Sequence, residues 1–261
     1  MNSIFSVVCI LLVASCAASS VKLEEIEHSI TAQNYLRNGY QLVWQDEFEG
    51  ESLDLQKWEY RQAGVLRNLG RVVKENVRLD GKGNLLIELR KEGNEYKIGQ
   101  IGTEKFYKTR YGYFECKAKM NHELGPHVAF WLQTPTMGKV LGNPSQSGVE
   151  IDIFEYHRKE PSTVHHNLHW DGYGADHKST GSKIAVPSVA SGFHTFGLLW
   201  TEKEYIFYVD GKETWRTITA ISNVDEYLIL SLELTGWGGD PSKAILPDEV
   251  VYDYVRVYQQ K

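Results

Sequence analysis

Short segments in which apolar and polar residues alternate recur from about residue 38 to the end of the chain. They are rich in β-branched and aromatic residues, and Gly, Asn, Asp or Pro separates one from the next. This pattern is typical of β-strands, and no long helical period appears after residue 40. Ten or more such strands predict an all-β domain, a sandwich or a barrel. Examples are YQLVWQDEF, RYGYFECKAKM, TVHHNLHW, EYIFYVDGKETWR and VVYDYVRVY.

Two tight turns follow from residue type. DGKG at 80–83 and DGK at 210–212 stand between alternating runs, and Asp-Gly pairs favour hairpin turns. Neither an internal repeat nor a Pro/Ser-rich linker divides the strand region. We therefore expect one domain over 38–261, preceded over 21–37 by a short helix or a linker.

The first 20 residues differ from the rest of the chain. Residues 4–18 carry no charge, and the apolar run is too short to span a bilayer comfortably and ends in small residues. These features predict a signal peptide over 1–20, although no Lys or Arg precedes the run. VASC at 13–16 resembles a bacterial lipobox, in which Cys16 would be acylated, and cleavage after one of the alanines is the alternative. Either route predicts an exported protein: extracellular, periplasmic or lipid-anchored at the cell surface.

Charge and cysteine content narrow the possible partners. The net charge is −6 and the pI is near 5.9, which argues against nucleic acid, because phosphate binding needs a basic patch. Cys9 and Cys16 fall in the predicted signal and leave Cys116 alone, so no intrachain disulfide is expected in the domain. Cys116 stands in an alternating run, and we expect a buried small residue rather than a nucleophile. We expect a monomer that reaches a membrane only through a lipid on Cys16.

The run GVEIDIFEYH places three carboxylic acids close together. On a regular strand, Glu150 and Asp152 share one face and Glu155 points to the other. If Phe154 is the extra residue of a β-bulge, Glu155 returns to the face of the other two acids. Two such carboxylates about 5–5.5 Å apart can serve as nucleophile and acid/base of a retaining glycosidase. The alternative is a set of ordinary surface acids on an edge strand.

EIDIFE resembles the signature of glycoside hydrolase family 16, in its longer form with one inserted bulge residue. Nearly the whole mature chain takes part in this resemblance, in the family's order. It implies a concanavalin-type jelly-roll β-sandwich with a cleft on the concave sheet. It also implies Glu150 as nucleophile, Asp152 as helper and Glu155 as general acid/base. The other matching segments are VWQDEFEG, ENVRLDGKGNLLIE, TRYGYFECKAKM, AFWLQ, FHTFGLLWTEKEYIFYVDGK and DYVRVYQ.

Four other residues are candidates for substrate binding. The resemblance places His169 near the acid/base, and a hydrogen-bonded histidine in the cleft wall is the alternative. Trp131 and Trp237 could stack on sugar rings: Trp237 stands in a Gly-rich loop, whereas Trp131 could equally belong to the core. Arg71 could contact substrate or be a solvated charge.

Metal chemistry receives little support from the sequence. The cluster of His165, His166 and His169 matches no common closed zinc spacing, so no cofactor is expected to be required. Some members of the family carry a structural calcium on the convex side, and Asp253 is the candidate ligand here. An ordinary turn or surface acid is the alternative.

One departure from the family pattern bears on the substrate. Members that cleave β-1,3-glucans commonly read Trp-Pro-Ala-Phe-Trp, where this chain has His127 and Val128 in place of Trp-Pro. The expected activity is retaining endo-hydrolysis of a β-linked polysaccharide, either a glucan or a galactan of agar or mucin type. A transglycosylase on the same substrates and a non-catalytic lectin are the alternatives.

Overall fold

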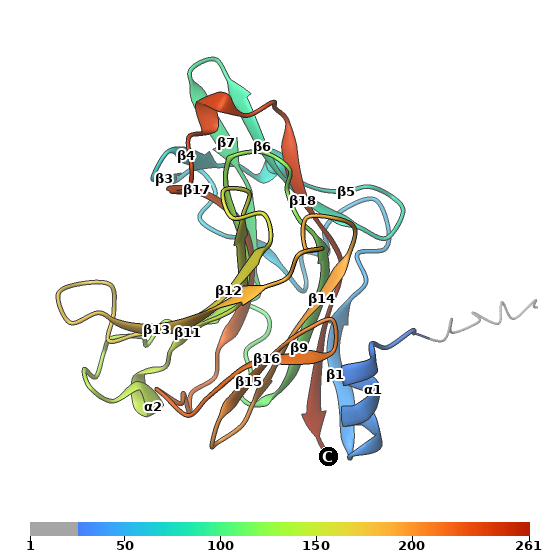
Figure 1. Cartoon of the computed structure of the whole chain (residues 1–261), viewed down its shortest axis with the longest axis vertical. Coiled ribbons are helices and arrows are strands. Elements are labelled where there is room, and N and C mark those ends of the chain that lie inside the picture. The colour runs from blue at the N-terminus through green and yellow to red at the C-terminus, as the bar shows by residue number, and fades with distance from the viewer. Residues whose placement is uncertain (1–25) are drawn as a thin grey trace, which may run out of the picture.

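The computed structural model describes residues 26–261, which form two β-sheets packed face to face (Figure 1). Such a sandwich buries one face of each sheet against the other. The expected jelly-roll β-sandwich is therefore confirmed. The predicted signal peptide, including Cys16, lies outside the described residues, and export, lipidation and the monomeric state stay predictions.

The seven-stranded sheet carries the acidic run on its third strand. Its strand order is β13-β12-β11-β10-β17-β8-β2, and every neighbouring pair within it is antiparallel. The strands are β2 (Glu59–Tyr60), β8 (Gln100–Gly102), β10 (Gly125–Gln133), β11 (Glu150–His157), β12 (Thr163–Trp170), β13 (Lys178–Ala185) and β17 (Tyr227–Gly238).

The second sheet has eleven strands and backs the first. Its main order is β16-β15-β14-β9-β18-β6-β7-β4-β3, while β1 pairs with β18 and β5 pairs with β6. The strands are β1 (Tyr40–Asp46), β3 (Leu66–Arg67), β4 (Gly70–Val72), β5 (Val77–Leu79), β6 (Leu85–Glu92), β7 (Glu95–Ile98), β9 (Gly112–Lys119), β14 (His194–Trp200), β15 (Tyr205–Val209), β16 (Lys212–Thr217) and β18 (Asp248–Gln260).

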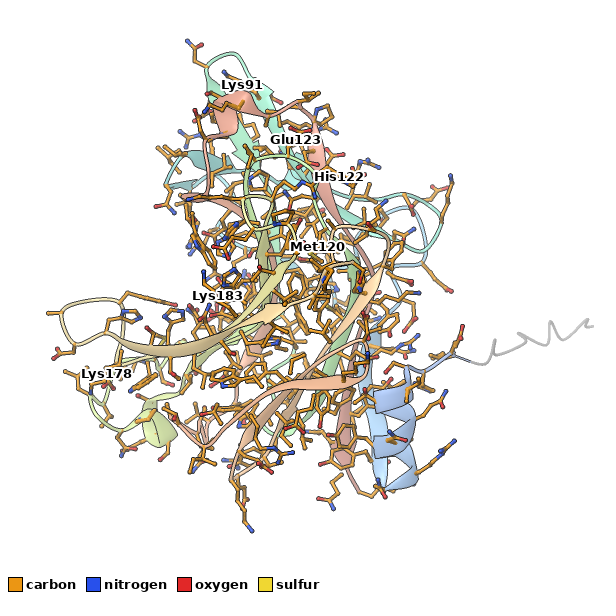
Figure 2. The ribbon with its side chains drawn as sticks, viewed as in Figure 1. Lys91, Met120, His122, Glu123, Lys178 and Lys183 are labelled. Carbon is orange, nitrogen blue, oxygen red and sulfur yellow. The ribbon has the colours of Figure 1, made fainter. Side chains whose placement is uncertain are left out.

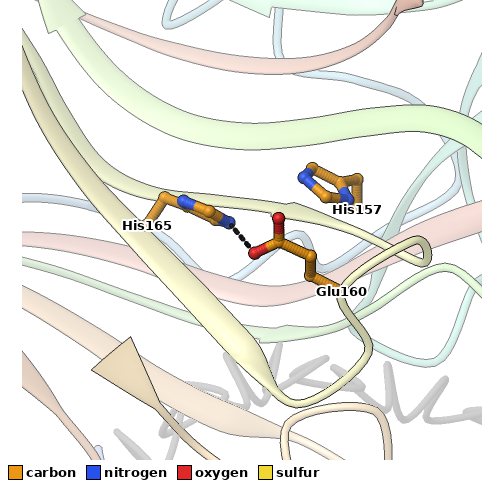
Figure 3. A group of neighbouring side chains, drawn as sticks. All are labelled: His157, Glu160 and His165. Atoms are coloured by element: carbon orange, nitrogen blue, oxygen red, sulfur yellow. Dashed lines mark ion pairs between the residues drawn. The ribbon is translucent and has the colours of Figure 1, made fainter. Parts of the chain in front are cut away.

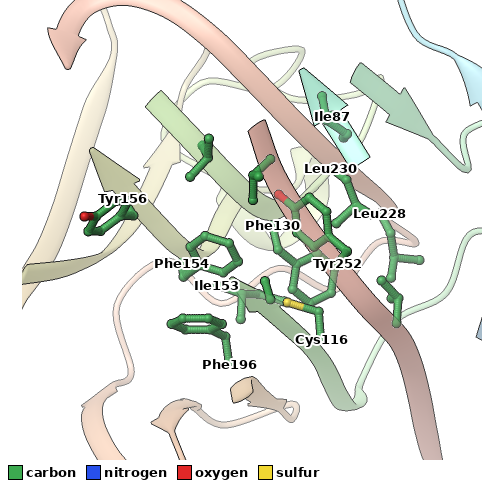
Figure 4. Close-up of a cluster of buried hydrophobic side chains, with 14 of the residues drawn as sticks. Ile87, Cys116, Phe130, Ile153, Phe154, Tyr156, Phe196, Leu228, Leu230 and Tyr252 are labelled. Carbon is green, nitrogen blue, oxygen red and sulfur yellow. The ribbon is translucent and has the colours of Figure 1, made fainter. Parts of the chain in front are cut away.

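Apolar residues from both sheets meet in one core (Figure 4). Phe154 of β11 and Phe196 of β14 touch across the two sheets, with ring centroids 4.2 Å apart. Cys116 of β9 is fully buried beside them, so the expectation of a buried, structural cysteine is confirmed. Alternation along each strand then leaves the opposite face of the seven-stranded sheet for polar side chains.

Helices are few and short in the described residues. They are α1 (Ile30–Arg37), α2 (Pro144–Ser147) and the 3₁₀ turns η1 (Lys74–Asn76) and η2 (Pro241–Lys243). Neither α-helix is long and apolar enough to cross a membrane. Ser29 caps α1 by accepting from the Ala32 N–H at 3.1 Å, and Ala32 packs against the outer face of the eleven-stranded sheet. The segment before the domain is thus partly a helix fastened to it.

The predicted turns lie where residue type placed them. DGKG at 80–83 connects β5 and β6, and Asp210-Gly211 connects β15 and β16. Asp210 and Gly211 both have positive φ, of 49° and 75°, as a tight hairpin turn of this twist requires.

Candidate active site

A β-bulge in β11 puts the three acids on one face. Opposite β10, Phe130 pairs with Phe154 and Trp131 pairs with Asp152, so Ile153 has no partner on that side. Ile153 and Phe154 both point into the core and are fully buried. The expected bulge is therefore present, with Ile153 rather than Phe154 as the extra residue. Because two consecutive residues face inward, Glu155 returns to the face of Glu150 and Asp152.

These acids lie in a cleft of about 500 Å³ on the face of the seven-stranded sheet turned away from the core. Strands β10, β11 and β17 form its floor, and two loops form its walls. The lining residues are Arg61, Gln62, Arg67, His127, Ala129, Trp131, Gln133, Glu150, Asp152, Glu155, Tyr173, Ser231, Glu233 and Thr235.

Glu150 is held by two hydrogen bonds at one end of the trio. The Tyr173 hydroxyl donates to its carboxylate, and Gln133 Nε2 donates to Oε2 at 3.1 Å. Gln133 is oriented in turn by the Tyr227 hydroxyl at 2.7 Å. Burial raises the pKa of Glu150 to about 7, although the Tyr173 hydrogen bond opposes that rise. Glu150 therefore changes its charge near neutral pH.

Asp152 lies between the two glutamates and is almost fully buried. Burial, with the charges of Glu155 and Glu150 added, raises the pKa of Asp152 well above its usual range. Both influences favour its protonated form, which would spare the cleft a third adjacent negative charge. His169 Nε2 lies 3.4 Å from Asp152 Oδ2, and His169 Nδ1 is 2.9 Å from His177 Nε2.

Glu155 is paired with a histidine from the neighbouring strand. His127 Nε2 lies 2.7 Å from Glu155 Oε1, and Asn167 donates to the other carboxylate oxygen. Burial alone would raise the pKa of Glu155, but the His127 cation outweighs it and holds this pKa below its ordinary value. Burial alone would likewise lower the pKa of His127, but the carboxylate raises it. Each partner therefore favours the charged form of the other.

The proposed stacking residues have different surroundings. Trp131 lines the cleft floor, with its indole N–H donated to Ser231 Oγ at 3.0 Å and the Arg61 guanidinium 5.1 Å above its ring. Trp237 is half-buried against three histidine rings beside the cleft, at centroid distances of 4.5–4.8 Å. Arg71 does not line the cleft. Its guanidinium is paired with Glu95 instead, with 2.7 Å between Arg71 Nε and Glu95 Oε1. Substrate contact by Arg71 thus gains no support.

The two unusual residues of β10 separate between the faces of the sheet. Val128 is fully buried in the core, so its replacement of proline does not alter the cleft. His127 faces the cleft and contacts Glu155. Of the two departures from the family pattern, only His127 therefore changes a side chain in the cleft, and it contacts the acid/base candidate Glu155.

Several cleft residues were not identified from the sequence. Gln133 could have been found, because it continues the alternation of His127, Ala129 and Trp131 along β10. Arg67 and Glu233, which pair at 3.0 Å across the cleft, come from distant strands, and no sequence signal joins them. Tyr173 comes from the loop between β12 and β13, and it lines the cleft.

The sequence predicted no zinc site for His165, His166 and His169, and it named Asp253 as the candidate calcium ligand. The three histidines of β12 diverge, since His166 points into the core and bonds the Ile153 carbonyl oxygen at 2.7 Å. Asp253 is paired with Lys117 Nζ at 2.7 Å, so a calcium ion would compete with that ammonium group. The side chains present around Asp253 do not fit calcium, and the calcium site stays a prediction without structural support.

A second hollow, of about 620 Å³, lies at another edge of the molecule, around Trp200 and Tyr111. Its acidic residues are Glu202 and Glu204, which follow β14 in a turn, and Glu204 is paired with Arg216 at 2.7 Å. Glu150, Asp152 and Glu155 are buried carboxylates whose pKa values are shifted in different directions, and they share one cleft, which makes the cleft the better candidate.

Comparisons with known proteins match the chain to enzymes that act on polysaccharides. A family model described as glycosyl hydrolases family 16 matches residues 68–256, more than half of the chain. A beta-glucanase of Rhodothermus marinus is 31% identical over 250 residues, which cover 84% of this chain and 85% of that relative. A glucan endo-1,3-beta-glucosidase A1 of Niallia circulans is 29% identical over 264 residues, with 85% of this chain covered. The match spans only 38% of that relative.

A solved structure matches the fold as well. It comes from work on endo-acting O-glycanases with which prominent members of the human gut microbiota initiate mucin breakdown. Its TM-score is 0.74 at 26% identity, with 85% of this chain and 92% of that chain covered.

Proposed function

Because this chain belongs to glycosyl hydrolase family 16, we propose that it hydrolyses internal β-linkages of a glucan or galactan with retention of configuration. The observation that carries this proposal is the bulge at Ile153, which brings Glu155 into the cleft of Glu150 and Asp152. A regular strand would have separated the two glutamates by the thickness of the sheet.

Glu150 acts as the nucleophile and Glu155 as the acid/base. In the first step a Glu150 oxygen bonds to the anomeric carbon while the bond to the leaving oxygen breaks, and Glu155 gives that oxygen a proton. In the second step Glu155 takes a proton from water, whose oxygen displaces Glu150 from the anomeric carbon. Two inversions at the same carbon give net retention.

The protons of the free protein are arranged differently from those of the first step. The pKa of Glu155 is held below its ordinary value and that of His127 above it, which favours the charged form of both, and Glu150 is only partly ionised near neutral pH. The 2.7 Å between His127 Nε2 and Glu155 Oε1 nevertheless allows a proton to pass between them. A sugar that displaces water from the cleft favours the uncharged form of this pair, in which Glu155 is the acid. Glu150 becomes a nucleophile as the pH rises through about 7.

A β-glucan is the first candidate substrate, because the relatives from Rhodothermus marinus and Niallia circulans are glucanases by name. A galactan of mucin type is the second candidate. His127, where glucan-cleaving members commonly carry tryptophan, and the similarity in fold to the mucin O-glycanase structure favour it. At this position a histidine can form a hydrogen bond with the sugar, whereas a tryptophan can stack on the sugar ring. His127 therefore contacts a substrate differently from the tryptophan of glucan-cleaving members.

The test is a panel of laminarin, mixed-linkage glucan, agarose, carrageenan and mucin O-glycans, with products sized by chromatography. We expect internal cleavage of one class and no cleavage by Glu150→Gln or Glu155→Gln, which keep the side-chain volume and the fold. Proton NMR of the first products should show the β-anomer. Normal turnover by Glu150→Gln would overturn the roles, and no reducing ends from any polysaccharide would favour the lectin. Products longer than the substrate would indicate transglycosylation.

A further inference from the structure

A second group of ligating side chains, His157, Glu160 and His165, lies outside the catalytic trio (Figure 3). It adjoins the acid/base, because His165 of β12 pairs with Glu155 of β11. His157 ends β11, Glu160 stands in the following turn, and His165 lies on β12. One nitrogen of each histidine and one carboxylate oxygen lie within 4.8 Å of one another. Figure 3 shows both rings turned toward the Glu160 carboxylate.

The histidines of this group are buried without adequate partners. His157 is 1% exposed, and neither of its ring nitrogens has a hydrogen-bond partner among residues 26–261. His165 is 3% exposed, and its Nε2 faces only the Glu160 carboxylate, at 3.3 Å. Burying an imidazole without a hydrogen-bond partner costs free energy. A metal ion bound by these ring nitrogens would offset that cost.

The donor set fits a transition metal. Two imidazoles and one carboxylate form the three-ligand set of zinc sites that keep a fourth position open. The ring centroids of His157 and His165 are 5.4 Å apart, which is close to the roughly 5 Å expected when two imidazoles bind one ion at about 2.0–2.1 Å.

We propose that His157, Glu160 and His165 bind one divalent transition-metal ion, with Zn²⁺ as the best-suited probe. The ion replaces the Lys183 ammonium, which lies 3.1 Å from Glu160 Oε1. Lys183 belongs to β13 and is labelled in Figure 2. Lys183 is two-thirds exposed and swings into solvent without a buried cost.

The proposed metal ligands are linked through Trp237 to the end of the cleft that contains Glu155. Trp237 packs its ring on both ligands, at centroid distances of 4.5 Å to His157 and 4.7 Å to His165. The same indole packs on His127 at 4.8 Å, and His127 holds Glu155. A bound ion therefore fixes the hairpin of β11 and β12 together with Trp237, without touching the sugar or the reacting atoms.

The test is Zn²⁺ titration by calorimetry of untagged, chelator-treated full chain at pH 7. We expect one equivalent bound by the wild type, a higher Tm with Zn²⁺ than without it, and a change in tryptophan fluorescence. Glu160→Gln, on the exposed turn, should fold normally and lose both the binding heat and the Tm shift. His165→Gln should do the same.

His169→Ala is the matched control, because Glu150, Asp152 and His169 form the other group that could hold a metal. It should bind Zn²⁺ as the wild type does. The proposal is overturned if the wild type binds no Zn²⁺ at millimolar concentration, if Glu160→Gln and His165→Gln bind it unchanged, or if His169→Ala abolishes binding. None of these outcomes depends on the hydrolytic activity.

Discussion

At the scale of single residues, the neighbours of the three carboxyl groups in the cleft shift their pKa values in different directions. Tyr173 favours the charged form of Glu150, and His127 favours the charged form of Glu155, whereas burial and the neighbouring glutamates raise the pKa of Asp152. Three acids of similar intrinsic pKa thereby differ in charge at one pH. The two partners come from a loop and from β10, so neither is visible in the acidic run itself.

Replacing Tyr173 should shift the pH dependence of catalysis. Its hydroxyl is the largest influence that lowers the pKa of Glu150, so Tyr173→Phe should raise that pKa above about 7. Since Glu150 must be ionised to attack, the acidic limb of the kcat/KM profile should move to higher pH. We expect a loss of roughly 10-fold at pH 6, because a hydrogen bond to a charged group is worth about 1.5–3 kcal/mol, and a smaller loss at pH 8.

The matched control is Tyr111→Phe, which removes a hydroxyl bonded to Asn223 outside the cleft. Its pH profile should overlay that of the wild type. An acidic limb that stays in place in Tyr173→Phe would mean that another group controls it.

At the scale of elements, β11 depends on one extra residue. Deletion of Ile153 leaves Glu150, Asp152 and Glu155 at alternate positions of a regular strand, and all three still face the cleft. Deletion of Ile151 keeps the bulge but turns Glu150 to the opposite face from Asp152. Both deletions remove one fully buried isoleucine from the same strand, which costs more than the roughly 2–5 kcal/mol of an Ile→Ala truncation.

We therefore expect unequal effects on hydrolytic activity from two deletions that each remove one buried isoleucine. The Ile153 deletion should fold with a lower Tm and keep measurable hydrolysis, whereas the Ile151 deletion should be as inactive as Glu150→Gln. Circular dichroism and thermal melts establish that each protein is folded before activity is compared. If the Ile153 deletion variant folds but is fully inactive, the bulge does more than place the Glu155 side chain on the cleft face of the sheet.

At the scale of the whole molecule, stability and catalysis are assigned to different faces. Helix α1 covers the outer face of the eleven-stranded sheet, while the cleft opens on the other sheet (Figure 1). Ser29, at the start of this helix, also donates to the buried Glu115. A change under α1 should therefore alter stability and leave the chemistry intact.

Ala32→Asp tests this separation. Ala32 is fully buried under α1, so a charge there should loosen the helix and lower the Tm by several degrees, at about 2–4 °C per kcal/mol for a chain of this size. Asn34→Asp places the same charge on the exposed side of α1 and should leave the Tm unchanged. Both should keep wild-type kcat at 25 °C. A large fall in kcat for folded Ala32→Asp would show that the two faces are coupled.

The sequence by itself determined what local patterns encode. Alternation with a period of two predicted the strands, Asp-Gly pairs predicted the hairpin of β15 and β16, and the alternating run around Cys116 predicted its burial. The acidic run predicted the chemistry and required a bulge, because strand geometry allows Glu155 to meet Glu150 in no other way.

Only the tertiary structure decided which distant side chains complete the cleft. His127, Tyr173 and Glu233 come from separate segments of the chain, and contacts across strands leave no periodic signal. The same holds for His157, Glu160 and His165, whose spacing follows the β11–β12 turn rather than a fixed motif. Pairing and packing bring such groups together, and the pKa values that follow from burial exist only in the folded molecule.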